Sequence, residues 1–267
     1  MKKLALLIYV LAASMGLKAD GIEVTLYIDE AYKPFSYAED GKPKGIYVDM
    51  LKLVFSKMPG FQVTLEPVPW KRGKKIMQEG EGFALAPAYF HGHDWPFLYP
   101  YSLPIFSETV IAICNESVMA HPRPNWPDDY KKLIIGNVAG YDGWGGIKFR
   151  KLVSKGMIYY QEVQNAETLI DMLLKGRLDC IMMENMIFDY HVRRLPSSLT
   201  RKEKEQIVYK KAATIGTDSV YIGYSAPAWQ KGTYPFARDF QKAFDNAVYQ
   251  LTQSGEIKNI FKAFKQE

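Results

Sequence analysis

The chain has 267 residues, of which 48% are hydrophobic and 24% are charged. This composition excludes a disordered, collagen-like or repeat-dominated chain and leaves room for one large domain or two modest ones. Two cysteines without a C-x-x-C pair exclude a disulfide-rich scaffold, a zinc ribbon and a thioredoxin-type motif.

Residues 1–19 are predicted to be a signal peptide. Lys2 and Lys3 precede an uncharged apolar run over residues 4–17, which is too short to span a membrane comfortably. We expect cleavage after Ala19, and no lipid anchor because no cysteine follows. Without this segment the chain carries 31 basic and 29 acidic residues, so its charge gives no reason to expect nucleic acid as a partner. No later segment approaches 18 apolar residues, and we expect a soluble, exported protein.

Along the rest of the chain, strand and helix patterns alternate. Residues 21–28 alternate apolar and polar side chains as a strand does, and residues 29–45 are expected to form a loop rich in Pro and Gly. Further strands are predicted at 61–68, 82–88, 109–114, 133–138, 157–163 and 178–183, and helices at 46–58, 70–78, 145–155, 166–175, 234–251 and 256–265. The β-α-β alternation appears once before and once after Thr109, which predicts an α/β fold with two lobes.

Several short motifs occur in a characteristic order along the chain. Tyr32–Tyr37 (YKPFSY), Asp40–Lys42 (DGK) and Gly45–Met50 (GIYVDM) open the series; Val68–Trp70, Gly136–Gly140 (GNVAG), Gly176–Asp179 (GRLD) and Ser254–Glu256 follow. Together they resemble the periplasmic (type II) solute-binding proteins of polar-amino-acid ABC importers, which are extracellular solute-binding proteins of family 3. The resemblance extends over essentially the whole mature chain.

The resemblance implies a two-lobed periplasmic-binding-protein fold in which two crossover strands form a hinge and the ligand lies in a cleft between the lobes. The first lobe would be residues 20–109 plus 219–267, and the second 110–218, with crossings at 109–113 and 219–224. It further implies a small-molecule ligand, an ABC permease as partner, a periplasmic location, a monomer, and no cofactor or catalysis. Ligands of such sheets bind beyond the carboxyl ends of the strands.

The candidate binding residues follow those strand ends. They are Asp29, Tyr32, Phe35, Trp70, Arg72, Tyr89, Gly140, Tyr141, Asp142 and Glu184. By the resemblance, Glu184 pairs with a substrate amine, Gly140–Asp142 bind a carboxylate through backbone N–H groups, and Tyr32 and Trp70 pack on the ligand's side chain. From the residues alone, Asp29 and Glu184 could equally be a solvated loop acid and an acid beside a helix N-terminus, and Trp70 a core residue.

One family feature is missing. The arginine that clamps a substrate carboxylate in the family would fall in His91–Asp94, where no arginine occurs. Arg72 could substitute for it, whereas Arg238 is expected on an outer helix. The acids and aromatics of the candidate site would also suit a cationic amine. We therefore predict capture of a small amine-bearing solute: an amino acid, a derivative or an organic cation.

Other interpretations remain open. His91 and His93 are two residues apart, but zinc needs three or four ligands, so exposed loop histidines are favoured over a metal site. By the resemblance, residues 109–114 lie antiparallel to 178–183, which would let Cys114 face Cys180; two buried free thiols are the favoured reading. The fold also hosts sensory proteins and exported dehydratases, but no nucleophile–base motif such as G-x-S-x-G occurs.

Overall fold

A computed structural model describes residues 21–141, 144–194 and 209–266. The predicted signal peptide and Asp142 lie outside these ranges.

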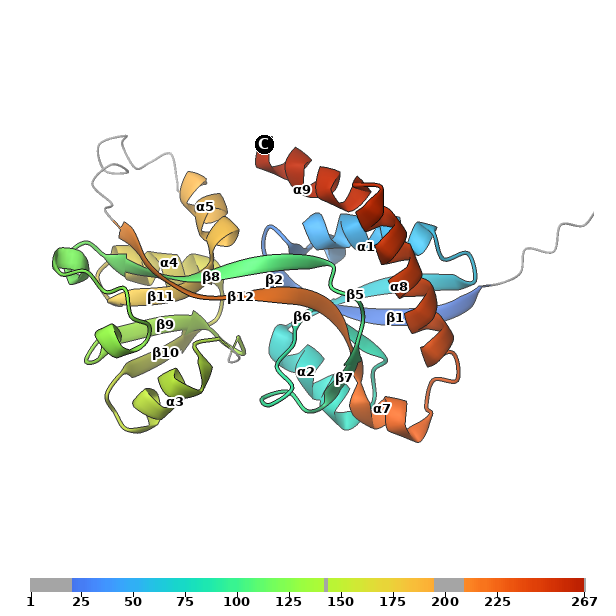
Figure 1. The fold of residues 1–267 in the computed structure, drawn as a ribbon, viewed down its shortest axis with the longest axis horizontal. Coiled ribbons are helices and arrows are strands. Elements are labelled where there is room, and N and C mark those ends of the chain that lie inside the picture. Colours follow the sequence, from blue (N-terminus) through green and yellow to red (C-terminus); the bar gives the residue numbers. More distant parts are fainter. Residues whose placement is uncertain (1–20, 142–143, 195–208, 267) are drawn as a thin grey trace, which may run out of the picture.

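The strands form one mixed sheet in the order β10-β9-β11-β8-β12-β6-β1-β5, with β7 paired to β12. On one side lie β1 (Ile22–Asp29), β5 (Phe61–Val68), β6 (Ala84–Tyr89) and β7 (Leu98–Tyr101); on the other lie β9 (Ile134–Val138), β10 (Tyr159–Val163) and β11 (Cys180–Glu184). Figure 1 shows the long strands β8 (Phe106–Asn115) and β12 (Tyr209–Ser225) running between the two groups. The predicted two-lobed α/β fold with two crossover strands is therefore confirmed, while the exact lobe boundaries stay a prediction.

Each lobe carries its own helices (Figure 1). The first lobe holds α1 (Ile46–Ser56), α2 (Trp70–Glu79), α7 (Ala226–Lys231), α8 (Ala237–Gln253) and α9 (Glu256–Gln266); the second holds α3 (Gly146–Ser154), α4 (Ala166–Leu174) and α5 (Asn185–Arg193), with 3-10 turns at Val118–Ala120 and Asp128–Tyr130. Every residue of β6 is buried, as expected of a strand at the centre of a covered sheet. The helices thus cover the apolar sheet faces and leave the strand ends to face the other lobe.

The parallel pairing fixes where the site forms. β1 pairs in parallel with both β5 and β6, so the carboxyl ends of these strands meet at one edge of the first lobe's sheet. Asp29 ends β1, Tyr89 ends β6, and Trp70 follows β5 by two residues. β9 ends at Val138 in the other lobe, and Tyr141 follows it. Polar and aromatic side chains of both lobes are therefore brought to the junction between them.

The prediction of a loop over residues 29–45 is incomplete, because this segment contains a small antiparallel sheet. It consists of β2 (Ala31–Tyr32), β3 (Ser36–Glu39) and β4 (Lys42–Lys44). Asp40 and Gly41 connect β3 to β4 with φ angles of 52° and 72°, as a tight hairpin turn requires. Gly45 then starts α1 with φ 116°, where a Cβ atom would lie 2.5 Å from the Phe35 carbonyl oxygen.

The expectation of two free thiols is wrong. β8 and β11 are antiparallel and place Cys114 directly opposite Cys180, and the two sulfurs form a disulfide with Cα atoms 4.0 Å apart. Both cysteines are fully buried. The bond fastens the first crossover strand to the second lobe, and it is consistent with an oxidising compartment.

Candidate functional site

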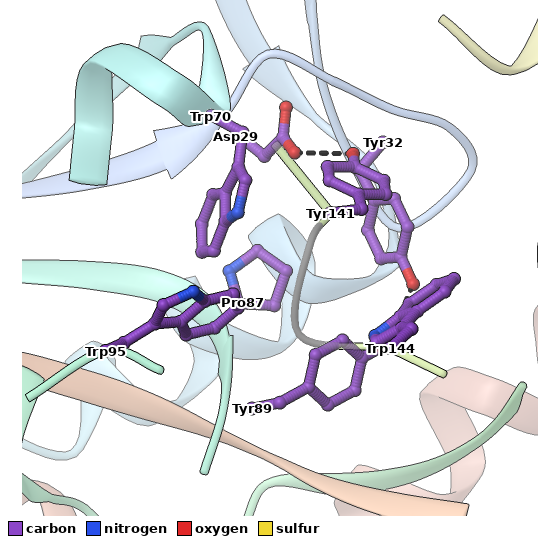
Figure 2. A pocket seen from close by; sticks show the side chains of 8 residues that line it. All are labelled: Asp29, Tyr32, Trp70, Pro87, Tyr89, Trp95, Tyr141 and Trp144. Carbon is purple, nitrogen blue, oxygen red and sulfur yellow. Dashed lines mark hydrogen bonds between the residues drawn. The ribbon is translucent and has the colours of Figure 1, made fainter. Parts of the chain in front are cut away.

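The strand ends enclose an aromatic pocket (Figure 2). It is lined by Asp29, Tyr32, Trp70, Pro87, Tyr89, Trp95, Tyr141 and Trp144, and holds about 280 Å³ of empty space, part of it open to solvent. Tyr141 and Trp144 come from the second lobe, and the other residues from the first. Five of the predicted site residues thus share one pocket, although their roles in binding stay predictions.

Asp29 is the acid of this aromatic pocket. Its side chain is only 2% exposed. One carboxylate oxygen accepts a hydrogen bond from the Ala31 backbone N–H at 2.9 Å, and the other from the Tyr141 hydroxyl of the opposite lobe at 2.6 Å. Burial raises the pKa of Asp29 to about 6, although both hydrogen bonds act to lower it. The carboxylate is consequently charged at neutral pH and faces a largely apolar wall.

A second buried acid, Glu108 on β8, holds the tyrosines of the site in place. Its side chain is 1% exposed and accepts hydrogen bonds from the hydroxyls of Tyr32, Tyr47 and Tyr89. Burial raises the pKa of Glu108, whereas the three hydroxyls lower it. Sequence reasoning missed this residue; the signal was a single acid in a crossover strand that is apolar over Val110–Cys114.

Glu184 lies in a different place from Asp29. Its side chain accepts a hydrogen bond from the Ile187 N–H at 2.9 Å and so caps the N-terminus of α5. It lines a second pocket of about 290 Å³, whose walls include Tyr32, Tyr141 and Trp144 of the aromatic pocket. Burial and the nearby Glu108 raise the pKa of Glu184 to about 8. This carboxyl group is therefore protonated more readily than a free glutamate, although backbone N–H bonds from Ile187, Met186 and Thr109 act to lower its pKa.

The other predicted residues lie outside the aromatic pocket. Phe35 is fully buried and stacks on Tyr47 with ring centroids 4.9 Å apart. Arg72 is exposed on α2 and lines neither pocket. The Gly140 carbonyl accepts a hydrogen bond from Lys74 Nζ at 2.8 Å. Pro87, Trp95 and Trp144 line the pocket without having been predicted: Pro87 lies within β6, and the approach of Trp95 and Trp144 depends on how their loops fold back.

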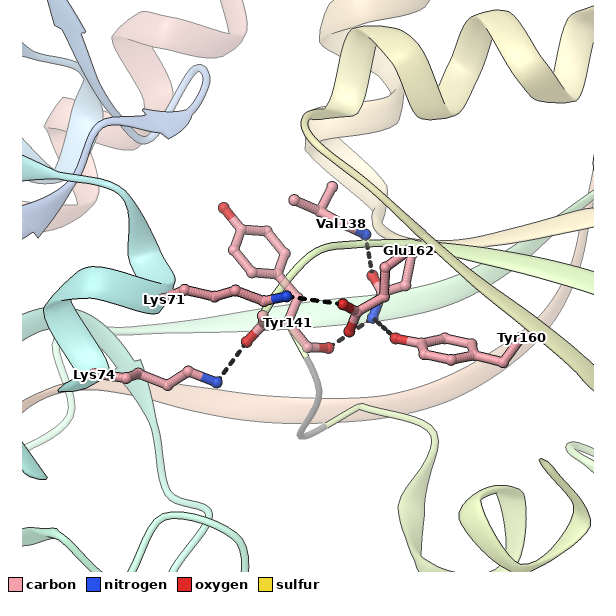
Figure 3. Close-up of polar contacts among 8 residues, drawn as sticks. Lys71, Lys74, Val138, Tyr141, Tyr160 and Glu162 are labelled. Atoms are coloured by element: carbon pink, nitrogen blue, oxygen red, sulfur yellow. Dashed lines mark hydrogen bonds and ion pairs between the residues drawn. The ribbon is translucent and has the colours of Figure 1, made fainter. Parts of the chain in front are cut away.

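Polar contacts span the cleft between α2 and the second lobe (Figure 3). Lys71 Nζ lies 3.1 Å from a Glu162 carboxylate oxygen, beside the bond from Lys74 to Gly140. The backbone carbonyl of Tyr141 accepts a hydrogen bond from the Asn137 side chain at 2.6 Å, which fixes the loop that carries the Tyr141 ring. The two lobes are therefore in contact across the site.

The family's arginine would fall in the segment His91–Asp94. A guanidinium group from the other lobe contacts this segment instead. Arg150 of α3 lies 2.6 Å from the Asp94 carboxylate. This arginine is paired with a protein acid and does not line the aromatic pocket. Within residues 21–141, 144–194 and 209–266, no group of three His, Cys, Asp or Glu side chains is placed to hold a metal ion.

Comparison with known proteins supports the sequence-based resemblance. The family model "Bacterial extracellular solute-binding proteins, family 3" matches residues 24–87. No curated protein matches the chain. In the described part of the chain, no helix has the length and apolar character needed to cross a membrane.

Solved structures match nearly the whole chain. GshT, from a study of glutathione import by Streptococcus mutans, covers 91% of this chain and 94% of its own at 15% identity and TM-score 0.71. The arginine-, lysine-, histidine-binding protein ArtJ from Geobacillus stearothermophilus covers 92% and 96% at 18% identity and TM-score 0.65. A histidine kinase sensor domain covers 91% and 96% at 12% identity and TM-score 0.68. AncCDT-1, an ancestral amino-acid-binding protein and precursor of cyclohexadienyl dehydratase, has TM-score 0.65 at 12% identity.

These matches define the fold of the molecule. At such low identity they show the fold, which is that of the two-lobed periplasmic binding proteins. The match of the N-terminal segment and the shared fold confirm the predicted resemblance to family 3 of the extracellular solute-binding proteins.

Proposed function

We propose that this chain is an exported solute-binding protein that captures a small amine-bearing solute for an ABC importer. The observation that carries the proposal is the buried Asp29 carboxylate among aromatic rings where the two lobes meet. A negative charge flanked by aromatic faces is a favourable environment for a cation. The contacts from Lys71 and Lys74 to the second lobe support binding coupled to closure of the lobes.

Asp29 is the acid that we assign to the ammonium group. The resemblance had favoured Glu184, but that side chain caps α5 and has a pKa raised to about 8. Asp29, with its pKa of about 6, is charged at neutral pH and lines the aromatic pocket directly. Glu184 is the second acid of the proposed binding site, and it would contact a part of the solute that reaches the second pocket.

The solute class includes amino acids, their derivatives and organic cations. ArtJ is described as binding arginine, lysine and histidine, which all carry amines. Neither pocket is lined by an arginine, so a carboxylate on the solute would depend on backbone N–H groups of the Gly140–Tyr141 loop or on lysines such as Lys33 in the second pocket.

The importer role, the export and the monomeric state belong to the same proposal. The apolar N-terminal segment supports cleavage after Ala19 and a periplasmic location. The Cys114–Cys180 disulfide also fits an exported protein. Mass spectrometry of the protein isolated from the periplasm should give an N-terminus at Asp20.

The experiment that tests the function is a thermal-shift screen of the mature chain against amino acids, polyamines, quaternary amines, carboxylates and sugars. A ligand present at 100 times its dissociation constant adds about 2.7 kcal/mol of stability, which is a readable shift. We expect stabilisation by amines or amino acids, with the ligand recovered unchanged. Stabilisation only by carboxylates or sugars would contradict the proposed solute class, and turnover of the ligand would contradict a role in binding alone.

A sensory role is the alternative, because a histidine kinase sensor domain shares this fold. In that case the protein would present its ligand to a receptor. Genes for a permease and an ATPase beside this one would favour the importer role.

A further inference from the structure

The walls of the aromatic pocket are arranged as a box. Six rings surround the space seen in Figure 2, and neighbouring rings meet at steep angles. Tyr32 and Tyr141 lie 5.4 Å apart at 84°, and Trp70 and Trp95 lie 5.9 Å apart at 64°. Tyr89 and Trp144 lie 5.6 Å apart at 65°. Faces of these rings, which carry the negative end of the aromatic quadrupole, border the pocket, and Lys74 Nζ already lies over the Trp95 ring at 5.0 Å from its centroid.

The hydroxyl groups of the pocket are already in use. Tyr32 and Tyr89 donate their hydroxyl hydrogens to Glu108, and Tyr141 donates its own to Asp29. Each of the two Asp29 oxygens also already accepts one hydrogen bond. The hydroxyl hydrogens of the pocket are therefore committed to the two acids, whereas the hydroxyl oxygens and the Asp29 carboxylate keep acceptor lone pairs.

This arrangement discriminates between kinds of ammonium group. A primary ammonium has three N–H donors, each of which needs an acceptor when it is buried. Within the described lining, the acceptors for these N–H groups are the Asp29 carboxylate and the remaining lone pairs of the Tyr32, Tyr89 and Tyr141 hydroxyls, all of which already take part in hydrogen bonds. A quaternary ammonium has no N–H donor, and aromatic faces together with a negative charge are sufficient to bind it.

We propose that the pocket takes the quaternary, N-methylated ammonium head group of a small solute. This inference rests on the proposed function and narrows its solute class. The methyl groups contact the rings, and Asp29 supplies the counter-charge from one side.

The test uses two matched pairs of probes that differ only in methylation: choline with ethanolamine, and trimethylglycine with glycine. Isothermal titration calorimetry of the mature chain measures each affinity. We expect at least one methylated probe to bind about tenfold or more tightly than its unmethylated partner. The two pairs also show whether a carboxylate on the solute contributes.

Two box variants test whether the rings cause this preference. Trp70→Leu and Trp144→Leu each remove one aromatic wall and keep an apolar side chain. We expect either variant to reduce the affinity for the methylated probe by about fivefold to tenfold. Trp229→Leu is the matched control, because Trp229 packs on Tyr224 outside the pocket. Melting curves followed by circular dichroism show that the variants are folded.

Equal or tighter binding of the unmethylated probes, or a basic amino acid as the best ligand, would overturn the inference and leave the proposed function in place. A preference for the methylated probes that is unchanged in both Trp70→Leu and Trp144→Leu would also overturn it. Absence of binding by every amine and amino acid would overturn both the inference and the proposed function.

Discussion

The protonation of Asp29 makes the binding of a cation depend on pH. A cation favours the ionised carboxylate. It therefore binds tightly at a pH above about 6, the pKa of Asp29 in the free protein, and competes with a proton at lower pH. We expect affinity for a cationic ligand to fall by up to about tenfold per pH unit below pH 6. The groups around this carboxylate are Tyr141, the Ala31 N–H and Glu30.

Titrations between pH 5 and 8 check this dependence. Asp29→Asn should bind more weakly at pH 7 and show a nearly flat profile between pH 5 and 6. A wild-type affinity that stays constant from pH 7 to 5 would remove Asp29 from contact with the ligand's charge.

Glu108 stabilises the walls of the pocket from behind. Glu108→Leu leaves the hydroxyls of Tyr32, Tyr47 and Tyr89 without their shared acceptor, and we expect a loss of about 3 kcal/mol or more in unfolding free energy. Glu108→Gln keeps one acceptor oxygen and should lose clearly less. Urea unfolding measures both variants, and equal stability of the two would show that the three hydroxyls do not depend on this acceptor.

At the scale of single residues, the sequence predicted Asp29, Tyr32, Trp70, Tyr89 and Tyr141 because each lies near the carboxyl end of a predicted strand. Trp95, Trp144 and Glu108 were missed, since they enter from loops and from a crossover strand whose path is set by tertiary packing. Arg72 was assigned to the cleft by helix position alone, and its side chain lies on the exposed face of α2.

At the scale of elements, the Cys114–Cys180 bond joins β8 to β11 and closes a long loop, with a sequence separation of 66. In the chain-entropy model, such a bond adds about 4 kcal/mol of stability by restricting the unfolded chain. We expect the double variant Cys114→Ala/Cys180→Ala to lose about 2–4 kcal/mol in urea unfolding. A thiol titration of the unfolded, unreduced wild type should find no free cysteine; two free thiols would contradict the disulfide.

The strands and helices that the sequence predicted correctly are those with a regular spacing of apolar residues. β5 occurs at the predicted residues 61–68, and the helices of the two βαβ units agree within a few residues, because their apolar spacing is regular. The short strands β2 to β4 and the helix α5 were not predicted. Residues 29–45 are too rich in Pro and Gly to show a strand period, and α5 follows the buried β11 directly, since Glu184 both ends the strand and caps the helix.

At the scale of the whole molecule, contacts across the cleft connect ligand binding to the approach of the lobes. Lys71 pairs with Glu162 of the other lobe, whereas Lys75 on the same helix pairs with Glu79 of its own helix. We expect Lys71→Ala to weaken ligand binding by about twofold to fivefold, as a partly exposed ion pair allows. Lys75→Ala is the matched control and should bind as the wild type does.

The salt dependence gives a second readout of the same contact. Screening weakens an exposed ion pair, so raising the ionic strength should reduce the difference between Lys71→Ala and the wild type. Equal affinities of wild type and Lys71→Ala at low ionic strength would show that this pair does not contribute to closure.

The most direct test of the account is calorimetric titration of the amine that stabilises the wild type best, carried out at pH 7 on Asp29→Asn and Glu184→Gln side by side. Burial raises the pKa of Asp29 in the aromatic pocket to about 6, whereas burial and Glu108 raise that of Glu184, which caps α5, to about 8. We expect Asp29→Asn to weaken binding by about tenfold or more and Glu184→Gln by less than about threefold. The reverse order would contradict the assignment of the cation to the aromatic pocket, and an amine that binds both variants as tightly as the wild type would contradict an acid-lined site between the lobes.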